Sequence, residues 1–274
     1  MIPGIHLNIP NKDYHAGAGV SKSGLWQIHK FSPAHYAYAP PEERNHFDIG
    51  EAGHIAVLEP DTFEARVHCG PEDRRGKKWL AAKDECDAAG WLLLTSGDYD
   101  KALKIRDTIH ADTTLNHLIT RGDRMIEASG YWTDPQTGML CRCRPDLWRR
   151  DLRLQIDLKT TVSARQEDFA RSVVNYGYHA QEAFYTDGWS QTGNQVDAFL
   201  FVAVEKKDPF CFSLYELPPS IVDEGRAIMR KSLGRYAECV ATQTWPGYAT
   251  GVQELTFPRW SYTEIEAPEM ETQQ

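Results

Sequence analysis

Two hydrophobic periods alternate along the second half of the chain. Runs in which every second residue is apolar predict strands, whereas apolar residues spaced three and four apart predict helices. Strand-like runs occupy residues 124–134, 139–148, 152–161, 196–206 and 210–218. A helical block over 164–191, broken near Asn175–Gly177, separates the third run from the fourth, and a helix over 219–241 follows the fifth. This β-β-β-α-β-β-α order predicts an α/β fold with one mixed central sheet flanked by helices.

The N-terminal part of the chain is predicted to be mainly helical. A short helix should begin with Ser21 or Ser23 as its N-cap and stop near Pro33. Further helices are expected over 47–58 and over 96–111, the latter opened by a Ser or Asp cap.

No internal repeat and no Gly/Ser-rich linker divides the chain, so a single domain over 1–274 is expected. Its parts would be the helical region over 1–120, the β-β-β-α-β-β-α core over 121–242 and an irregular tail over 243–274. No apolar stretch is long enough to span a bilayer, and the start shows no signal-peptide pattern. A cytoplasmic protein without a membrane partner is therefore expected.

Six cysteines are scattered along the sequence. A chain of 274 residues with 41% apolar residues can build a core without disulfides, so reduced thiols are expected. Cys141 and Cys143 lie at strand spacing, with no second Cys pair and no Cys/His cluster in the sequence. They are therefore predicted to be buried side chains rather than metal ligands.

The net charge of −9 argues against a protein that coats DNA. It does not exclude an enzyme that meets DNA in a local basic groove, or one whose acidic site is neutralised by metal ions. Arginines that could contact phosphates gather on and after the second strand-like run: Arg142, Arg144, Arg149, Arg150 and Arg153. A solvated surface position is the alternative for each of them.

The third strand-like run contains the main candidate chemistry. Alternate residues of a strand face the same way, so Asp157 and Lys159 should project together while their apolar neighbours enter a core. Asp146 lies eleven residues earlier and follows Pro145. Because proline cannot donate a ladder hydrogen bond, the second strand should bend, fray or lie at an edge there, which lets Asp146 turn inward.

Two carboxylates on neighbouring strands repel each other unless a cation lies between them. Hard oxygen ligands of this kind suit Mg²⁺ or Mn²⁺. Lys159 beside them could orient or deprotonate a water, or stabilise charge on a phosphate. An ordinary Asp–Lys ion pair on an exposed strand face is the alternative, and it would be preferred for an isolated D-x-K triplet.

The set "RPD…IDLK" resembles the PD-(D/E)XK nuclease signature, with Asp146 and Asp157 as the acids and Lys159 as the lysine. Gln181 and Tyr185 match the Q-x-x-x-Y motif of the RecB-like exonuclease branch and share one helix face. The resemblance narrows to the RecE-type nuclease domain of exodeoxyribonuclease VIII, from about residue 3 to about residue 240, through five segments in order: "VSKSGLWQIHKFSPAHY", "GEAGHIAVLEPDTF", "KALKIRDTI", "EASGYWTDPQTGMLCRCRPD" and "NYGYHAQEAFY".

This resemblance implies a Mg²⁺-dependent exonuclease of the bacterial host cytoplasm that digests linear double-stranded DNA from 5′ ends. The product would be a 3′ single-stranded tail for a single-strand annealing protein. The resemblance also implies a closed homo-oligomeric ring, a trimer or tetramer, around DNA ends. An endonuclease on the same fold and a catalytically silent DNA-binding subunit remain alternatives.

Individual roles also follow from the resemblance. The metal ligands would be Asp146, Asp157, the Leu158 carbonyl and His54. The catalytic set would be Asp146, Asp157, Lys159, Gln181, Tyr185 and Glu127, with Gln181 and Tyr185 fixing Lys159 and the scissile strand. The DNA contacts would come from Arg142, Arg144, Ser21 and Ser23. Without the resemblance, His54 would be a core helix histidine, Glu127 an outward-facing strand residue, and the two serines helix caps.

Overall fold

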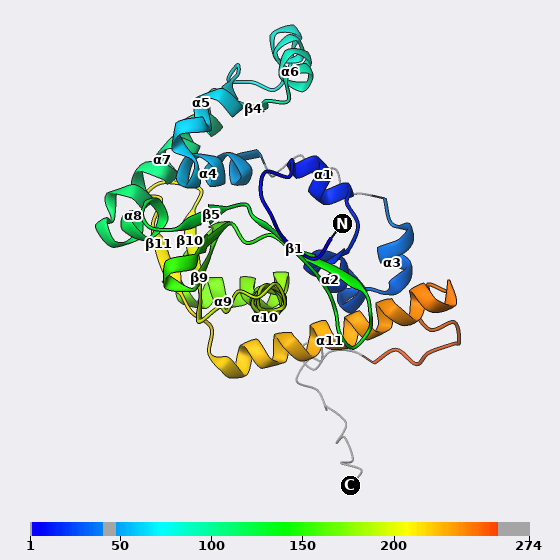
Figure 1. The fold of residues 1–274 in the computed structure, drawn as a ribbon. Coiled ribbons are helices and arrows are strands. Elements are labelled where there is room, and N and C mark those ends of the chain that lie inside the picture. Colours follow the sequence, from blue (N-terminus) through cyan, green and yellow to red (C-terminus); the bar gives the residue numbers. More distant parts are fainter. Residues whose placement is uncertain (1, 41–47, 257–274) are drawn as a thin grey trace, which may run out of the picture.

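Two sheets form the centre of the molecule in the computed structural model, which describes residues 2–40 and 48–256 (Figure 1). A five-stranded sheet has the order β11-β10-β9-β8-β5, a four-stranded sheet has the order β1-β6-β7-β2, and β3 pairs with β4. The strands are β1 (Gly4–His6), β2 (Val20–Ser21), β3 (Val67–Cys69), β4 (Leu92–Leu94), β5 (Arg124–Ile126), β6 (Ser129–Thr133), β7 (Leu140–Cys143), β8 (Leu147–Arg149), β9 (Leu154–Thr161), β10 (Ala198–Glu205) and β11 (Phe212–Tyr215).

Helices occupy much of the remaining described chain. They are α1 (Asn11–Ala16), α2 (Lys22–Lys30), α3 (Pro33–Tyr38), α4 (Asp48–Leu58), α5 (Phe63–Arg66), α6 (Lys77–Ala89), α7 (Ser96–Ala111), α8 (Thr113–Thr120), α9 (Gln166–Tyr176), α10 (Tyr178–Gln191) and α11 (Pro219–Thr242). Figure 1 shows α6 and β4 projecting away from the two central sheets. The mixed α/β architecture predicted from the sequence is confirmed.

The predicted mixed sheet flanked by helices is present, but the hairpin is shared with a second sheet, because its two strands each break in the middle. Glu127 has a φ of 50°, a left-handed conformation that interrupts the first run between β5 and β6. The second run is interrupted at Pro145, between β7 and β8. One end of the hairpin therefore joins the four-stranded sheet (β6 and β7) and the other end joins the five-stranded sheet (β5 and β8).

Local capping explains where several helices begin and end. Ser21 is the N-cap of α2 and accepts a hydrogen bond from the Gly24 backbone N–H at 3.4 Å. The cap of α7 is Thr95, not a residue within the 96–111 run as expected, and its side chain accepts from the Asp98 N–H. Gly177 adopts a φ of 66° between α9 and α10, so the break predicted near this residue is confirmed.

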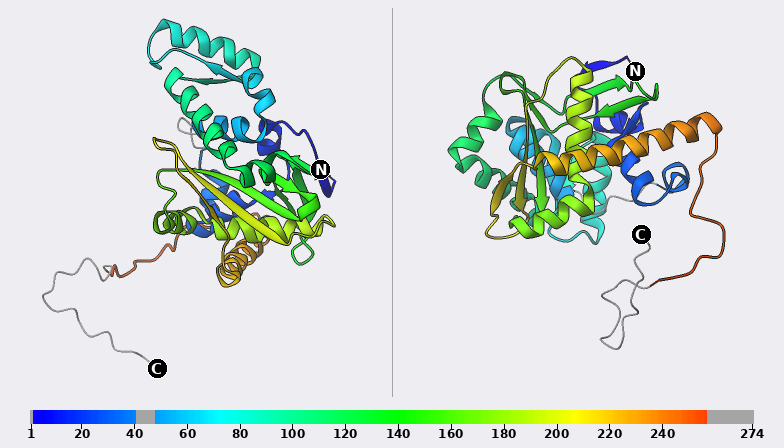
Figure 2. Two further views of the ribbon diagram at one scale, coloured as in Figure 1. Left: turned by 90° about the vertical axis from the view of Figure 1, so that its left-hand side faces the viewer. Right: turned by 90° about the horizontal axis from the view of Figure 1, so that it is seen from below.

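Helices cover both faces of the five-stranded sheet (Figures 1 and 2). Ile156 and Leu158 of β9 belong to an apolar cluster shared with α4, α7 and α8 on one face. On the other face, Phe199 and Phe201 of β10 pack against α9, and α10 packs against α11. Strand β9 is thus enclosed on both sides, which is why its Asp157–Lys159 face is not an open surface.

Two further expectations concern the cysteines and the membrane. Cys141 and Cys143 are free thiols with no exposed surface, as predicted. In the described part of the chain, every helix is too short or too polar to cross a bilayer.

Candidate active site

The register of β8 and β9 brings Asp146 and Asp157 together. The antiparallel ladder ends at the pair of Leu147 and Ile156, and Asp146 and Asp157 are the next residues beyond it on the two segments. Asp146 Oδ2 accepts a hydrogen bond from the backbone N–H of Leu158, the residue after Asp157. The two acids are therefore near each other, as the sequence predicts.

Pro145 shapes the backbone at the same point. A second step along the ladder would place Pro145 opposite Leu158, but proline has no N–H to donate to the Leu158 carbonyl. The Leu158 N–H instead donates to Asp146 Oδ2 at 2.7 Å. Because the N–H and C=O of one residue point to the same side of a strand, the Leu158 carbonyl is directed toward Asp146 as well.

Asp157 is enclosed by polar partners from two elements. Its side chain is 1% exposed, Lys159 Nζ forms an ion pair with its Oδ1, and Gln181 Nε2 donates to its Oδ2. Burial and the charge of Asp146 raise the pKa of Asp157 to about 6. Gln181 thus holds the second acid of the motif, whereas the sequence prediction had assigned it to Lys159.

Lys159 stays a cation in this environment. Burial lowers the pKa of its ammonium, but the charges of Asp157 and Asp146 outweigh burial and raise that pKa above the ordinary value. The ammonium also lies 4.7 Å from the ring centroid of Tyr178. Lys159 is therefore a charged hydrogen-bond donor at neutral pH, held between Asp157 and the Tyr178 ring.

His54 reaches Asp146 from α4 on the other side of the sheet. Its Nε2 lies 3.0 Å from Asp146 Oδ2, and its Nδ1 lies 2.7 Å from the Gly50 carbonyl, to which it donates. Burial lowers the pKa of His54, but the charge and hydrogen bond of Asp146 outweigh it and raise the pKa to about 9. The same contacts hold the pKa of Asp146 below its usual range, despite its burial.

Glu127 borders the site from the turn between β5 and β6. Its N–H donates to the Asp146 carbonyl at 3.0 Å, and its carboxylate lies 3.8 Å from the Arg144 guanidinium. Burial, followed by the charge of Asp146, raises the pKa of Glu127 to about 7. Glu127 and His54 line a cavity of about 260 Å³ together with Arg144.

Arg142 and Arg144 are turned inward. Each is 8% exposed. The guanidinium of Arg142 donates to the carbonyls of His15 and Gly17, and that of Arg144 donates to Ser129 Oγ and the Ile9 carbonyl. Their observed role is to fix the N-terminal segment against the sheet, and contact with DNA remains a prediction for them.

Ser21 and Ser23 lie at the start of α2, where the sequence placed them. Ser21 caps the helix, and its Oγ is 3.1 Å from Ser23 Oγ. The residue between them, Lys22, was not singled out from the sequence. Its ammonium donates to the Tyr176 carbonyl at 2.6 Å, and burial, followed by the charge of Lys159, lowers its pKa to about 7.

Tyr178 is a second site residue that sequence reasoning missed. It lies under the Lys159 ammonium, one turn before Gln181 on the same face of α10, with Tyr185 a further turn along. Burial, followed by the charges of Tyr14 and Asp157, raises the pKa of Tyr185 well above its ordinary value, so its hydroxyl stays protonated. The i, i+3, i+7 spacing of this face was the available signal for Tyr178.

The donor set fits a hard divalent cation. His54 Nε2 lies 3.0 Å from Asp146 Oδ2, and the Leu158 N–H donates to the same oxygen. Burial, followed by the negative charge of Asp146, raises the pKa of Asp157. Carboxylate oxygens of this kind suit Mg²⁺ or Mn²⁺. As placed, Lys159 and His54 balance that charge, and no group of three or more His, Cys, Asp or Glu side chains within residues 2–40 and 48–256 is close enough to hold an ion.

The fold and this constellation define the PD-(D/E)XK class: a mixed sheet whose neighbouring strands present Asp146, Asp157 and Lys159. The family comparison agrees with that class. Residues 30–256 match the model of the PDDEXK-like domain of unknown function (DUF3799), and the chain belongs to this family.

Two solved structures are similar to the chain. One is a candidate exonuclease from Eubacterium rectale, with a TM-score of 0.61 and 14% identity over 92% of this chain and 96% of that one. The other is a phage-related exonuclease from Haemophilus somnus, with a TM-score of 0.37 and 12% identity over 84% and 99% of the two chains. At 14% identity, the first likeness shows the fold alone. No curated protein matches the sequence.

Glu182, next to Gln181 on α10, gives a test of the electrostatics around this helix. It is 8% exposed, its Oε2 lacks a hydrogen-bond partner among the described residues, and burial, followed by the charge of Glu216, raises its pKa from 4.5 to about 8. Between these pH values the unfolded chain releases a proton that the folded chain keeps, so the free energy of unfolding falls as pH rises.

Glu182→Gln should remove this pH dependence. The stability advantage of the variant over the wild type should be small near pH 4.5, grow through the window and level off above about pH 8. Urea unfolding across that window measures the difference. Glu224→Gln, at an exposed position of α11, is the matched control and should run parallel to the wild type. A constant gap between Glu182→Gln and wild type would contradict the assigned pKa.

Proposed function

We propose that this protein is a Mg²⁺-dependent exonuclease that hydrolyses phosphodiesters of linear double-stranded DNA, in the 5′ to 3′ direction. The observation that supports the proposal most is that Asp146 accepts from the Leu158 N–H, next to Asp157, while Lys159 is ion-paired with Asp157. Family membership supports nuclease chemistry. Direction, a ring-shaped oligomer and delivery of 3′ tails to an annealing protein rest on the resemblance to RecE-type domains.

Asp146, Asp157, the Leu158 carbonyl and His54 would hold Mg²⁺. When bound, the ion supplies positive charge beside the phosphate oxygens and makes an attacking water more acidic. The protein's own residues position the reactants. Lys159 carries a proton at Nζ and can donate it in a hydrogen bond to a water or a phosphate oxygen at the site.

Residues of α10 hold Lys159 and Asp157 in place. Gln181 fixes Asp157 Oδ2, which leaves Oδ1 for Lys159, and the Tyr178 ring supports the ammonium. Lys159 is thereby held at the carboxylate that would hold Mg²⁺, from which its ammonium can donate a hydrogen bond to the substrate. His54, held by the Gly50 carbonyl through Nδ1, presents Nε2 on the same side as Asp146 Oδ2.

Digestion of end-labelled duplexes tests the proposal. Linear DNA labelled at either 5′ or 3′ ends should lose its 5′ label first, and only with Mg²⁺, whereas covalently closed circular duplex should stay intact. Nicking of the circle would instead favour an endonuclease on the same fold. Binding of duplex without any Mg²⁺-dependent cleavage would indicate a silent DNA-binding subunit.

A further inference from the structure

An exposed aromatic ring lies at the end of α9, close to the Asp157–Lys159 face. Tyr176 is 61% exposed, although its helix and the next one pack against the sheet. The Lys22 ammonium donates a hydrogen bond to the Tyr176 carbonyl, and the positive charge of Lys159 lowers the pKa of Lys22 further, after burial. Tyr176 is therefore a surface residue on the border of the candidate active site.

Tyr176 is the outer member of a series of stacked rings. Its ring lies 5.7 Å from that of Tyr178 at an interplanar angle of 26°, and Tyr178 lies 5.8 Å from Phe201 at the same angle. Phe201 is fully buried on β10, where its register partner on β9 is Asp157. The series thus runs from the strand beside the second acid to the surface.

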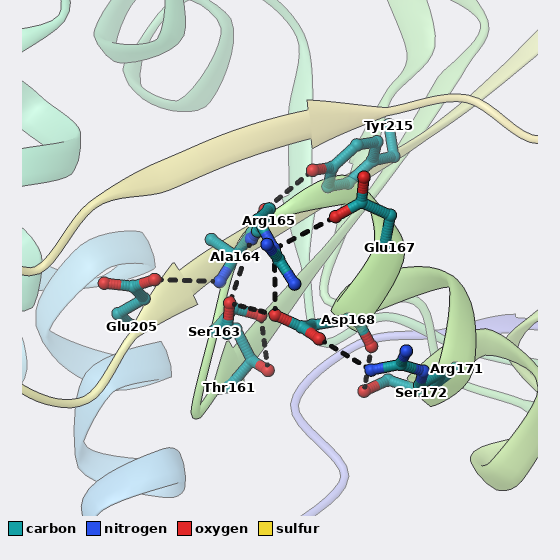
Figure 3. Close-up of polar contacts among 10 residues, drawn as sticks. All are labelled: Thr161, Ser163, Ala164, Arg165, Glu167, Asp168, Arg171, Ser172, Glu205 and Tyr215. Carbon is teal, nitrogen blue, oxygen red and sulfur yellow. Dashed lines mark hydrogen bonds and ion pairs between the residues drawn. The ribbon is translucent and has the colours of Figure 1, made fainter.

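Both ends of α9 are anchored, so Tyr176 is held in a defined place. At the start of the helix, Asp168 accepts hydrogen bonds from Ser163, Arg165 and Arg171 at 2.9, 3.2 and 3.0 Å (Figure 3). At its end, Gly177 lies so close to the Trp26 ring that an added Cβ would be 2.6 Å from it. These contacts hold α9 in place, so the Tyr176 ring at its end has a defined position before any ligand binds.

The chemistry around Tyr176 matches a nucleotide. Aromatic side chains bind unpaired bases by stacking, and this binding tolerates any base because every base has a π-face. Lys22, whose ammonium donates to the Tyr176 carbonyl, is repelled by the charge of Lys159, and a bound anionic phosphate would relieve that repulsion. An exposed ring with neighbouring cations therefore suits one nucleotide of a DNA strand.

We infer that Tyr176 is a stacking platform for a nucleobase of the DNA strand, at the nucleotide next to the phosphate that is cleaved. The inference rests on the proposed nuclease function. It adds a binding residue outside the acid–lysine motif, with Tyr178 and Gly177 as positioning residues. The base must be unpaired to offer its face, so the platform acts on DNA ends and not on the interior of a duplex.

Tyr176→Ala tests this inference in the full-length chain, with duplexes carrying 2-aminopurine at the terminal nucleotide. In EDTA, where no cleavage is expected, the wild type should quench 2-aminopurine by stacking. Tyr176→Ala should lose the quenching and bind roughly 5- to 150-fold more weakly, the range typical for one stacked base. Tyr176→Phe should retain both properties. Tyr248→Ala removes a comparably exposed ring whose ring contact is with His35, and it should change neither.

Cleavage provides a second measurement. The kcat/KM for Mg²⁺-dependent digestion should fall by a similar factor in Tyr176→Ala and not in Tyr176→Phe. If EDTA abolishes DNA binding by the wild type, this kinetic comparison tests the inference in place of the binding assay. If the wild-type enzyme is active and Tyr176→Ala has the same DNA affinity, quenching and kcat/KM, the inference about Tyr176 is wrong while the proposed function stands. A wild type that neither binds nor cleaves DNA would overturn the proposed function and the inference with it.

Discussion

Lys159→Met should reduce Mg²⁺-dependent DNA cleavage by roughly 10²- to 10³-fold, the usual contribution of one hydrogen-bond donor that stabilises transition-state charge. Methionine keeps much of the length of the side chain and its packing on Tyr178 while removing the ammonium. The variant loses the hydrogen-bond donor that Asp157 and Asp146 keep charged in the wild type. The initial rate of digestion of linear duplex at saturating Mg²⁺ measures the effect.

The fold should survive this change. Without the Lys159 ammonium, the pKa of Asp157 should rise further, because its ion pair is lost while burial and the charge of Asp146 remain. Asp157 can then take up a proton and avoid a buried uncompensated charge, and Gln181 still donates to it. The thermal unfolding temperature should therefore fall little, which separates lost chemistry from lost structure.

Lys207→Met is the matched control, because this lysine is exposed beyond the end of β10. It should cleave at the wild-type rate. A Lys159→Met protein that retains more than about a tenth of wild-type activity would remove Lys159 from the mechanism, since a loss below tenfold corresponds to less than about 1.4 kcal/mol of activation free energy.

The centre of the site could be predicted because its geometry is local. Alternation along β9 fixes the side to which Asp157 and Lys159 point. Pro145, before Asp146, lies at the break between β7 and β8. Gln181 was placed on the correct helix face by its spacing, but not against the correct partner. Its partner depends on how α10 lies across β9, and helical periodicity does not contain that information.

The surroundings of the site depend on contacts between distant segments. Arg142 of β7 and Arg144 just after it appeared available for DNA, because the carbonyls of residues 9–18 that they contact are more than 120 positions away in the sequence. Lys22 meets Tyr176 across 154 positions. The four short strands before residue 95 have two or three residues each, too few to show a period.

The split of the hairpin between two sheets had only one visible signal. Pro145 predicts the break in the second strand. The break in the first strand is at Glu127, and glutamate predicts no break because it rarely adopts a left-handed conformation. That conformation is held by the fold, since the Glu127 N–H donates to the Asp146 carbonyl across the two turns. The paired breaks place an acid from each strand at the junction, so the departure from a regular hairpin creates the edge of the site.

Gly225→Ala should destabilise the protein and also slow cleavage. Gly225 lies where α11 crosses α10, and an added Cβ would be 2.4 Å from the His179 carbonyl oxygen and 2.7 Å from the Ala180 nitrogen. Both contacts are to backbone, so α10 itself must move. Overpacking of this kind costs about 1–3 kcal/mol, and only about 1 kcal/mol is recovered from the better helix propensity of alanine.

The matched control is in the same helix. Gly234 is exposed, and a Cβ added there would meet nothing within 4 Å, so Gly234→Ala should stabilise the protein by up to about 1 kcal/mol. The two variants should therefore move the thermal midpoint in opposite directions. Because the backbone displaced by Gly225→Ala directly precedes Gln181, the hydrogen bond to Asp157 should be disturbed and kcat should fall below the wild-type value in that variant alone. Equal stability and equal kcat in the two variants would show that α10 does not lie against α11 as described, and that Gln181 is positioned by something other than this helix crossing.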